Sequence, residues 1–351
     1  MRFIGSKERL LDFIYTVALH QGIKQGVVFD IFSGTGVVGS YFKKKGFSVI
    51  SNDHLFFSYI LQYVYIQMND YPEFNHFPVS GKTNLERCSR VISYLNSLEG
   101  EKDFVYYHYS PGGTAGRMYF TEENAQKIDA VRNTIEEWKG NGIIKQSEYY
   151  FLVCSLVEAV PFVSNIAGVY GAYLKRWDRR AFKDLELNLP KVTVSDRSCV
   201  SYHQDANHLI QDIPCNLLYI DPPYNDRQYI TNYHVLETIA KWDRPPVYGR
   251  TGLRPYHGQK SDYCYQGKAQ KALQDLVLSA RTNHIIMSYN SEGVMPAKDI
   301  SNLLSLRGKV QTYQQDYRRY RSDVDSGKRN YKVKNDLVKE LLFYCKVESG
   351  S

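Results

Sequence analysis

The chain has 351 residues, of which 43% are hydrophobic and 23% are charged, and its formal net charge is +7 with a sequence pI of about 8.8. A hydrophobic share of this size makes a substantial core possible, and the sequence contains no low-complexity segment. The mild basic excess is compatible with a polyanionic partner, whereas the 30 tyrosines do not by themselves decide a function.

The cysteines and the apolar segments exclude several further classes. The six cysteines are scattered without a C-x-x-C pair, so we expect neither a metal site nor a disulfide framework, and a reducing, cytoplasmic setting. The opening MRFIGSKERLL has no apolar signal core. The apolar run from Tyr149 to Leu174 is interrupted by Glu158 and Pro161, which favours buried helix over a membrane span.

The first 53 residues predict a βαβ unit. Helical spacing covers residues 6–22, with Ser6 as a plausible N-cap and Gly22 as a plausible stop. A buried strand follows at residues 27–31, and the glycines after it form a turn into a helix. The segment FSVISND then reads as a second strand that ends at Asp53. Such a unit implies a parallel sheet.

The middle of the chain interrupts this pattern. Residues 72–118 hold several prolines and glycines with few periodic runs, so we interpret them as irregular, whereas residues 121–138 and 147–160 look helical. From Val192 the α/β pattern returns with four strand candidates, VTVSD, NLLYIDPPY, HIIMSYN and VKELLFYCKV. The interruption of roughly 120 residues is longer than an ordinary loop and predicts a domain of its own.

The glycine turn is the first candidate binding motif. In DIFSGTGVVG, from Asp30 to Gly39, Gly34 and Gly36 allow a tight turn and a close approach of backbone to ligand. The G-x-G-x-x-G spacing is weak alone, because it suits a dinucleotide or a nucleoside with an amino-acid tail. Asp53, at the end of the next strand, either bonds ribose hydroxyls or caps a helix.

Two other segments leave alternatives open. In FIGSK, Lys7 could hold a carboxylate and Phe3 could cover a ring, or the segment is an ordinary helix start. Asp205 follows the strand candidate VTVSD and either contacts an amino group or begins a helix.

The segment LLYIDPPYNDRQY places a carboxylate, a rigid turn and an aromatic ring at a strand end. The run from Leu217 to Ile220 predicts a short buried strand, and the prolines end it because they lack the N–H that a ladder needs. Asp221 is therefore expected at a sheet edge, either as a simple cap or as a functional acid.

Two basic, aromatic segments are candidates for phosphate or base contacts. YLKRWDRRAFKD runs from Tyr173 to Asp184, and a hairpin is expected near residues 313–336 with a turn at Asp325 to Gly327. The alternative in each case is a solvated, charged surface. The candidate residues are Lys175, Arg176, Arg179, Arg180, Arg318, Arg319 and Arg321.

Taken in order, FIGSK, DIFSGTG, a long insertion and DPPY resemble the Dam-like, alpha-group DNA adenine-N6 methyltransferases of bacterial restriction–modification systems. The resemblance runs almost end to end and includes GVYGAYLKRWD and YRRYRSD. It implies a Rossmann-like, seven-stranded class I methyltransferase core from residues 1–70 and 191–351. A mainly helical target-recognition insertion would occupy residues 71–190.

The resemblance also implies roles for single residues, with S-adenosyl-L-methionine as the cofactor. Asp221, Pro222, Pro223 and Tyr224 would be catalytic, and Tyr224 would stack on a flipped base. The cofactor-binding residues would be Phe3, Ile4, Gly5, Ser6, Lys7, Asp30, Phe32, Ser33, Gly34, Gly36, Asp53, Asp205 and Asp221.

The function expected on this basis is transfer of a methyl group to the N6 amino group of adenine in double-stranded DNA. We expect a monomer with a cognate restriction endonuclease in the same system and no membrane association. The open alternatives are cytosine-N4 methylation, which shares the direct mechanism, an RNA amino-methyltransferase, and a catalytically silent DNA-binding protein. The late hairpin is assigned to phosphates and the insertion to bases, and the target sequence is not readable from the chain.

Overall fold

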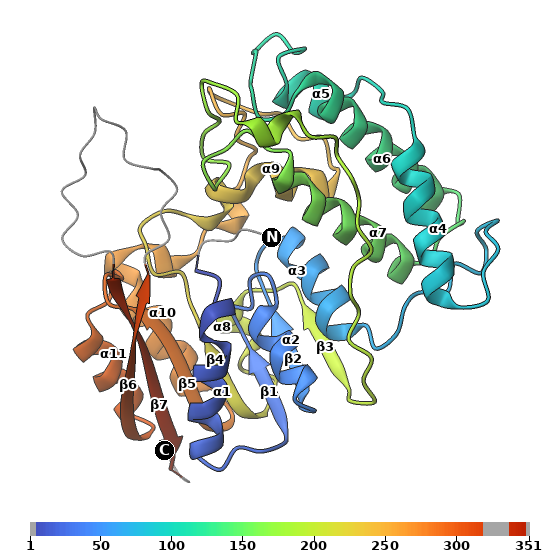
Figure 1. Ribbon diagram of the computed structural model, residues 1–351. Coiled ribbons are helices and arrows are strands. Elements are labelled where there is room, and N and C mark those ends of the chain that lie inside the picture. The colour runs from blue at the N-terminus through green and yellow to red at the C-terminus, as the bar shows by residue number, and fades with distance from the viewer. Residues whose placement is uncertain (1–4, 319–336, 349–351) are drawn as a thin grey trace. The chain divides into compact units, whose positions relative to one another are not determined.

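The computed structural model describes residues 5–318 and 337–348, and Figure 1 shows the arrangement of their helices and strands. The chain divides into two compact units. We call the first the helical unit, which comprises Leu55–Val194 and Ile230–Gly258. We call the second the sheet unit, which comprises Ile4–His54, Ser195–Tyr229 and Gln259–Ser351. Each is described by itself.

The sheet unit is built on a seven-stranded sheet within the described residues, in the order β3-β2-β1-β4-β5-β7-β6. The strands are β1 (Val27–Asp30), β2 (Ser48–Asn52), β3 (Cys199–Tyr202), β4 (Cys215–Ile220), β5 (Thr282–Asn290), β6 (Gly308–Arg318) and β7 (Leu337–Val347). The five strands β3, β2, β1, β4 and β5 are parallel to one another. Strand β7 is antiparallel to both of its neighbours, β5 and β6. This order confirms the Rossmann-like, seven-stranded core expected from the sequence.

Helices cover both faces of the sheet. The helices of this unit are η1 (Glu8–Leu10), α1 (Leu11–His20), α2 (Val37–Lys44), α8 (Ala206–Leu209), η6 (Asp262–Cys264), α10 (Gln266–Ser279) and α11 (Ala297–Ser305). One face packs Phe29, Leu218 and Met287 against residues of α8, α10 and α11. On α1, Tyr15 meets Phe42 of α2 edge-on with ring centroids 5.8 Å apart. The alternation along each buried strand supplies both faces with apolar side chains.

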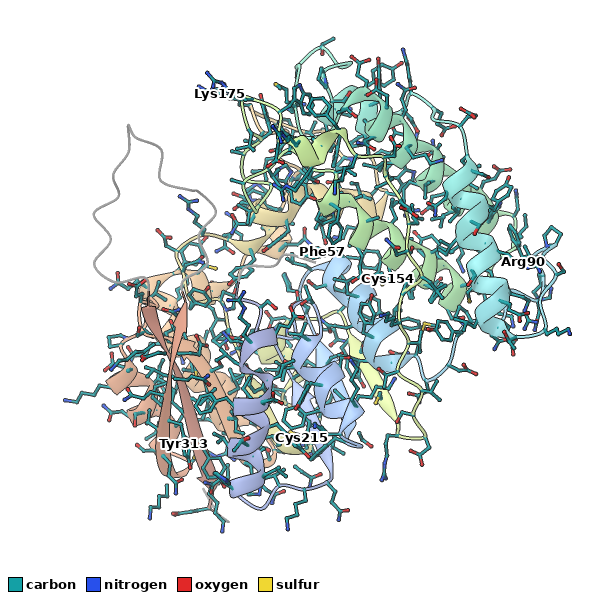
Figure 2. All side chains as sticks on the ribbon, viewed as in Figure 1. Phe57, Arg90, Cys154, Lys175, Cys215 and Tyr313 are labelled. Atoms are coloured by element: carbon teal, nitrogen blue, oxygen red, sulfur yellow. The ribbon has the colours of Figure 1, made fainter. Side chains whose placement is uncertain are left out.

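The helical unit contains α3 (Phe56–Gln62), η2 (Tyr63–Gln67), α4 (Asn84–Ser97), α5 (Phe104–Tyr109), α6 (Glu122–Gly140), α7 (Gln146–Ala159), η3 (Val160–Phe162), η4 (Arg179–Phe182) and α9 (Tyr229–Lys241). Helix α7 is buried along almost its whole length, as the apolar run predicted. The six cysteines of the chain are free and buried, and Figure 2 marks Cys154 in this unit and Cys215 in the sheet unit.

Three expectations about elements differ from the structure. Residues 72–118 were expected to be irregular, but α4 begins at a Thr83 cap and buries Val91 and Leu95. The strand expected at VTVSD is wrong, because residues 192–196 form no strand, Val194 is 71% exposed and β3 begins at Cys199. The N-cap of the first helical turn is Lys7 and not Ser6.

The unit boundaries also differ from those expected. Residues 55–70 and 230–258 were expected in the core, but the structure places them in the helical unit. None of the helices in residues 5–318 and 337–348 is both long and apolar enough to cross a membrane.

Candidate active site

The acids predicted from separate motifs meet at the carboxyl edge of the sheet unit. Asp30 ends β1, Asp53 follows β2, and Asp221 follows β4. Since β2, β1 and β4 are parallel neighbours, their carboxyl ends lie side by side. The strand order reverses at β1, because β2 and β3 lie on one side of it in the sheet and β4 and β5 lie on the other. Open α/β sheets bind ligands in the crevice at such a switch point.

The glycine turn links β1 to α2 and is held by the two flanking acids. Ser33 Oγ and the Gly39 N–H donate to Asp30 Oδ2 at 2.8 and 3.1 Å. The Gly34 N–H donates to Asp53 Oδ2 at 2.9 Å. Gly34 and Gly36 have φ values of +54° and +78°, a region that favours glycine, and Gly36 is the N-cap of α2.

Asp30 has one oxygen satisfied and one not. Its Oδ1 is buried and has no hydrogen-bond partner among the described residues. Burial raises the pKa of the Asp30 carboxyl to about 7; the Ser33 bond opposes that rise and Asp221 adds to it. An unpartnered carboxylate oxygen beside a glycine turn fits a ligand that carries an amino group, because such a ligand supplies the missing donor.

Lys7 lies in the segment before η1 and forms ion pairs with two acids of the site. Its Nζ lies 3.0 Å from Asp221 Oδ1 and 2.8 Å from Glu340 Oε1. Burial lowers the pKa of Lys7, but the two carboxylates outweigh burial and raise that pKa above its usual value. Gly5 (φ +78°) lies against Tyr224, because a Cβ at Gly5 would stand 3.4 Å from a Tyr224 ring carbon. The I-G-S-K and D-P-P-Y segments are thus in contact.

Asp221 keeps one oxygen available. Its side chain is 17% exposed, and Oδ1 bonds Lys7 whereas Oδ2 has no partner within the described residues. Burial raises the pKa of the carboxyl to about 7; Lys7 opposes the rise and Glu340 adds to it. Pro222 is buried, Pro223 and Tyr224 are half-buried, and the Tyr224 carbonyl accepts from the Val294 N–H at 2.9 Å.

The other predicted cofactor residues have different surroundings. Phe32 packs edge-on against Tyr263 with ring centroids 4.9 Å apart. Asp205 caps α8, since its Oδ1 accepts from the N–H groups of Asn207 and His208. The helix-start interpretation of Asp205 therefore accounts for one of its oxygens. Phe3 and Ile4 lie outside the described residues.

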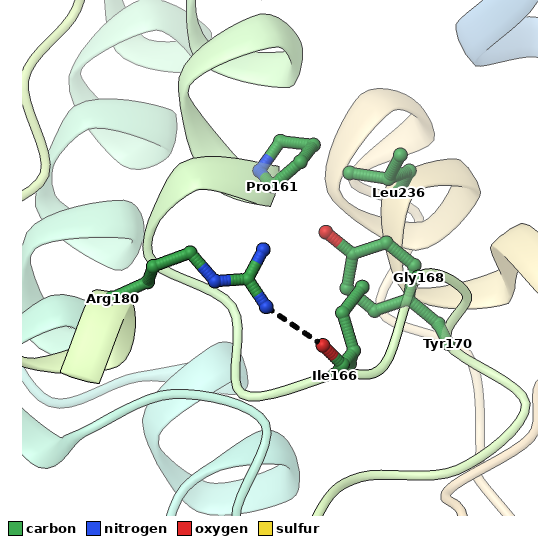
Figure 3. Close-up of a pocket in the computed structure, with 6 residues that line it drawn as sticks. All are labelled: Pro161, Ile166, Gly168, Tyr170, Arg180 and Leu236. Atoms are coloured by element: carbon green, nitrogen blue, oxygen red, sulfur yellow. Dashed lines mark hydrogen bonds between the residues drawn. The ribbon is translucent and has the colours of Figure 1, made fainter. Parts of the chain in front are cut away.

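The predicted DNA-contacting residues fall into two groups. Lys175, Arg176 and Arg179 are exposed in the helical unit, and Figure 2 shows Lys175 at the periphery of that unit. Arg180 is committed internally, because it pairs with Asp178 at 3.0 Å and donates to the Ile166 carbonyl at 3.1 Å. Figure 3 shows that second bond on the wall of a small pocket. Arg319, Arg321 and the side chain of Arg318 lie outside the described residues.

Two members of this site were not among the predicted site residues, Ser288 of β5 and Glu340 of β7. Ser288 Oγ donates to Glu340 Oε1 at 2.6 Å, and Glu340 is 2% exposed. A signal existed, since Glu340 is an acid immediately before the apolar run LLFYC. A buried acid inside a strand requires a partner, and such acids are candidates for functional sites.

The comparisons with known proteins agree with this geometry. The family model of the D12 class N6 adenine-specific DNA methyltransferase matches residues 3–303. A Neisseria lactamica protein, Type II methyltransferase M.NlaIII, is 36% identical over 337 residues, which cover 95% of this chain and 96% of that protein. The chain belongs to the D12 class of N6 adenine-specific DNA methyltransferases.

Two longer relatives are also similar. Type II methyltransferase M.FokI of Planomicrobium okeanokoites is 43% identical over 352 residues, with 98% of this chain and 52% of that protein covered. Modification methylase StsI of Streptococcus sanguinis is 40% identical over 351 residues, with 98% and 51% covered. The chain therefore spans about half the length of these two relatives.

Proposed function

We propose that the chain transfers a methyl group from S-adenosyl-L-methionine to the N6 amino group of adenine in duplex DNA. The observation that carries the proposal is Asp221, which pairs with Lys7 through Oδ1 and leaves Oδ2 for another donor. Membership of the N6 adenine-specific family supports the choice of base and of DNA. Names of type II methyltransferases among the relatives support a cognate restriction endonuclease as a partner.

The chemistry explains why an acid and a proline carbonyl are placed together. The exocyclic amine of adenine is a poor nucleophile, because its lone pair is delocalised into the ring. Asp221 Oδ2 and the Pro222 carbonyl would accept the two N–H groups, which localises that lone pair on nitrogen. The proline rings fix the backbone direction before the substrate arrives, so little reorganisation is needed. Tyr224 would stack on the base after it leaves the duplex.

The residues of the turn would hold the cofactor, which supplies an electrophilic methyl group when bound. The unpartnered Asp30 Oδ1 would accept from its amino group. Asp53 would bond the ribose hydroxyls, and Gly34 and Gly36 would let the backbone approach closely. The segment from Phe3 to Lys7, with Ser33 and Phe32, would complete the binding residues, and Asp205 would do so only through the oxygen that does not cap α8.

The helical unit would supply target recognition. Its exposed basic residues Lys175, Arg176 and Arg179 stand beside Trp177 and Phe182, whose rings are 5.8 Å apart. Arg180 would stabilise the segment from Tyr173 to Asp184 by its contacts with Asp178 and the Ile166 carbonyl, and would not contact DNA. The late basic segment with Arg318, Arg319 and Arg321 would bind phosphates.

The direct test is methyl transfer by an Asp221 variant. Purified chain is incubated with methyl-labelled S-adenosylmethionine and unmethylated DNA, and the nucleosides are then separated. We expect label in N6-methyladenine, and Asp221→Ala should lower the rate by about a hundredfold or more, because one preorganised acceptor is removed. Cofactor binding should change little.

Asp226→Ala is the matched control, because Asp226 is an exposed acid in the same loop. Label in N4-methylcytosine alone, or in structured RNA but not DNA, would replace the proposed function with the corresponding alternative. A near-normal rate for Asp221→Ala would remove Asp221 from its role, as would an equal loss in Asp226→Ala.

A further inference from the structure

A buried chain of polar groups connects Asp221 to β7. The Lys7 ammonium lies between Asp221 and Glu340, at 3.0 and 2.8 Å. Ser288 Oγ donates to the same Glu340 oxygen at 2.6 Å. The side chains of Lys7 and Glu340 are 5% and 3% exposed, so water contributes little to solvating either charge.

The strand register explains why these residues meet. Side chains two residues apart share one face of a sheet. On β7, Phe343 and Cys345 pack into the core on one face, so Leu342 and Glu340 point to the other. Ser288 is opposite Leu342 in the ladder, which places it diagonally next to Glu340 on that face. The antiparallel strand thus returns an acid to the edge where the parallel strands end.

A buried ion pair is weak evidence for stability. Removing two charges from water costs free energy that their attraction does not always return, and an apolar replacement is often neutral or better. Here a single ammonium stands between two carboxylates, and Asp30 is a third acid nearby. The second carboxylate therefore needs an explanation other than stability.

We propose that Glu340, held by Ser288, is a positioning residue that fixes the Lys7 ammonium and thereby orients Asp221 for methyl transfer. The inference rests on the proposed function of Asp221. An ammonium bound to Asp221 alone could rotate with that side chain. An ammonium anchored on β7 ties Asp221 Oδ1 to the sheet, so that Oδ2 faces the substrate amine in one orientation.

The network also sets when Asp221 is ionised. Burial has the largest influence on the Asp221 pKa and raises it, Lys7 lowers that pKa, and Glu340 raises it by its negative charge. The titratable groups around Asp221 all belong to the sheet unit. Lys7 lies before η1 and Glu340 on β7, and Asp30 and Tyr219 lie at the ends of β1 and β4. Tyr224, after β4, faces Lys7. Removal of Glu340 and removal of Lys7 should therefore shift the pKa in opposite directions.

The experiment measures single-turnover methyl transfer from pH 5.5 to 9 with saturating S-adenosylmethionine and DNA. In Glu340→Gln, the acidic limb of the rate profile should move to lower pH by about one unit, because a nearby like charge is removed. In Lys7→Met, the limb should move to higher pH. The plateau rate of Glu340→Gln should fall roughly tenfold or more, since misplacement of a reacting group is costly.

Three further variants separate charge from position. Glu340→Asp keeps the charge but shortens the side chain, so its limb should stay in place while its plateau falls. Ser288→Ala removes only the hydrogen bond and should do the same to a smaller extent. Glu348→Gln is the matched control, because Glu348 is an exposed acid just beyond β7, and it should match the wild type.

The outcomes distinguish this inference from the proposed function. Absence of N6-methyladenine with the wild-type chain would reject the proposed function itself. If the wild type is active, two results would show that Glu340 has only a structural role. One is an acidic limb of the rate profile that does not move in Glu340→Gln, and the other is a rate that falls by the same factor in every variant at every pH. If Glu340→Gln does not fold, as judged by circular dichroism and cofactor binding, Glu340→Asp and Ser288→Ala decide, since wild-type plateaus in both would overturn the inference.

Discussion

Asp30, at the carboxyl edge of the sheet, has one bonded oxygen and one buried oxygen without a partner among the described residues. The bonded oxygen is Oδ2, which accepts from Ser33 and Gly39, and the other is Oδ1. Burial raises its pKa to about 7, so the group titrates near neutral pH instead of being ionised throughout. A cationic amino group bound at Oδ1 would favour the ionised form.

Cofactor affinity should therefore depend on pH. Below about pH 7 the Asp30 carboxyl is protonated and attracts an ammonium weakly, whereas above that pH it is ionised. We expect the affinity for S-adenosylmethionine to rise with pH through about 7 and then level off, as measured by calorimetry from pH 5.5 to 8.5. Asp30→Asn keeps an oxygen for Ser33 and Gly39 and should flatten the dependence. An affinity that is constant or falls as pH rises would contradict this role.

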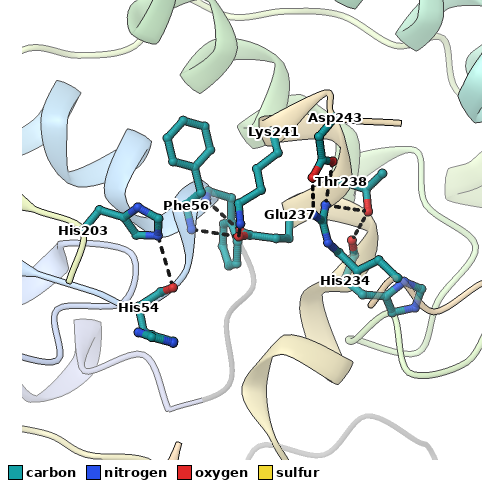
Figure 4. Close-up of polar contacts among 10 residues, drawn as sticks. His54, Phe56, His203, His234, Glu237, Thr238, Lys241 and Asp243 are labelled. Atoms are coloured by element: carbon teal, nitrogen blue, oxygen red, sulfur yellow. Dashed lines mark hydrogen bonds and ion pairs between the residues drawn. The ribbon is translucent and has the colours of Figure 1, made fainter. Parts of the chain in front are cut away.

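At the scale of elements, α3 depends on an acid far along the chain in the same unit. The N–H groups of Phe56 and Phe57 donate to the two Glu237 oxygens at 3.1 and 3.0 Å, and Lys241 pairs with Glu237 at 3.1 Å. Figure 4 shows these contacts between the start of α3 and α9. Glu237 is fully buried, and its negative charge suits the N-terminus of a helix.

Glu237→Ala should destabilise the helical unit. It leaves buried N–H donors without their acceptors and Lys241 without its partner, at a cost of about 2–4 kcal/mol. The readouts are the urea midpoint and the exchange protection of the Phe56 and Phe57 amides. Glu237→Gln retains one acceptor oxygen and should be destabilised less. Unchanged protection of both amides in the alanine variant would show that the cap is dispensable.

The same scale shows what sequence patterns could and could not predict. Glycine turns and buried runs identified β1, β2, β4, β5 and β7, because each signal is local. Strand β3 is only four residues long. Its Ser201 hydroxyl forms a hydrogen bond with the Ser51 hydroxyl of β2, and such a contact between distant residues leaves no local sequence signal. Helix α4 has a Thr83 cap and buried residues at helical spacing, but prolines precede and follow it in the chain, and such residues are typical of irregular structure.

At the scale of the whole molecule, the sequence motifs predicted which acids lie at the carboxyl edge of the sheet, but they did not predict where the two compact units begin and end. Asp30 ends β1, and Asp53 and Asp221 directly follow the neighbouring strands β2 and β4. Parallel topology alone brings such strand ends together. Membership of α9 in the helical unit is set by contacts such as Glu237 with α3 and Tyr170 N–H with the Asn232 carbonyl at 2.7 Å. Those contacts join residues far apart in the chain, so spacing does not reveal them. Glu340 was missed for the same reason.

Target recognition by the helical unit should depend on Lys175 and Arg176. Both side chains are exposed, and neither forms a salt bridge within the described residues. If they contact bases, the double variant Lys175→Ala with Arg176→Ala should relax the preferred sequence by about 1–3 kcal/mol at each position read. Lys82→Ala with Arg90→Ala is the matched control, because both residues are exposed in the same unit.

The measurement is a genome-wide map of methylated adenines in a host that lacks other adenine methylation, together with DNA binding over a range of salt. Base contacts predict a broader methylated motif in the first double variant and an unchanged motif in the control. Phosphate contacts instead predict an unchanged motif, weaker binding to every sequence and a salt slope lower by about two, one for each cationic side chain removed. That second pattern would transfer base reading away from this loop, because phosphates carry no sequence information.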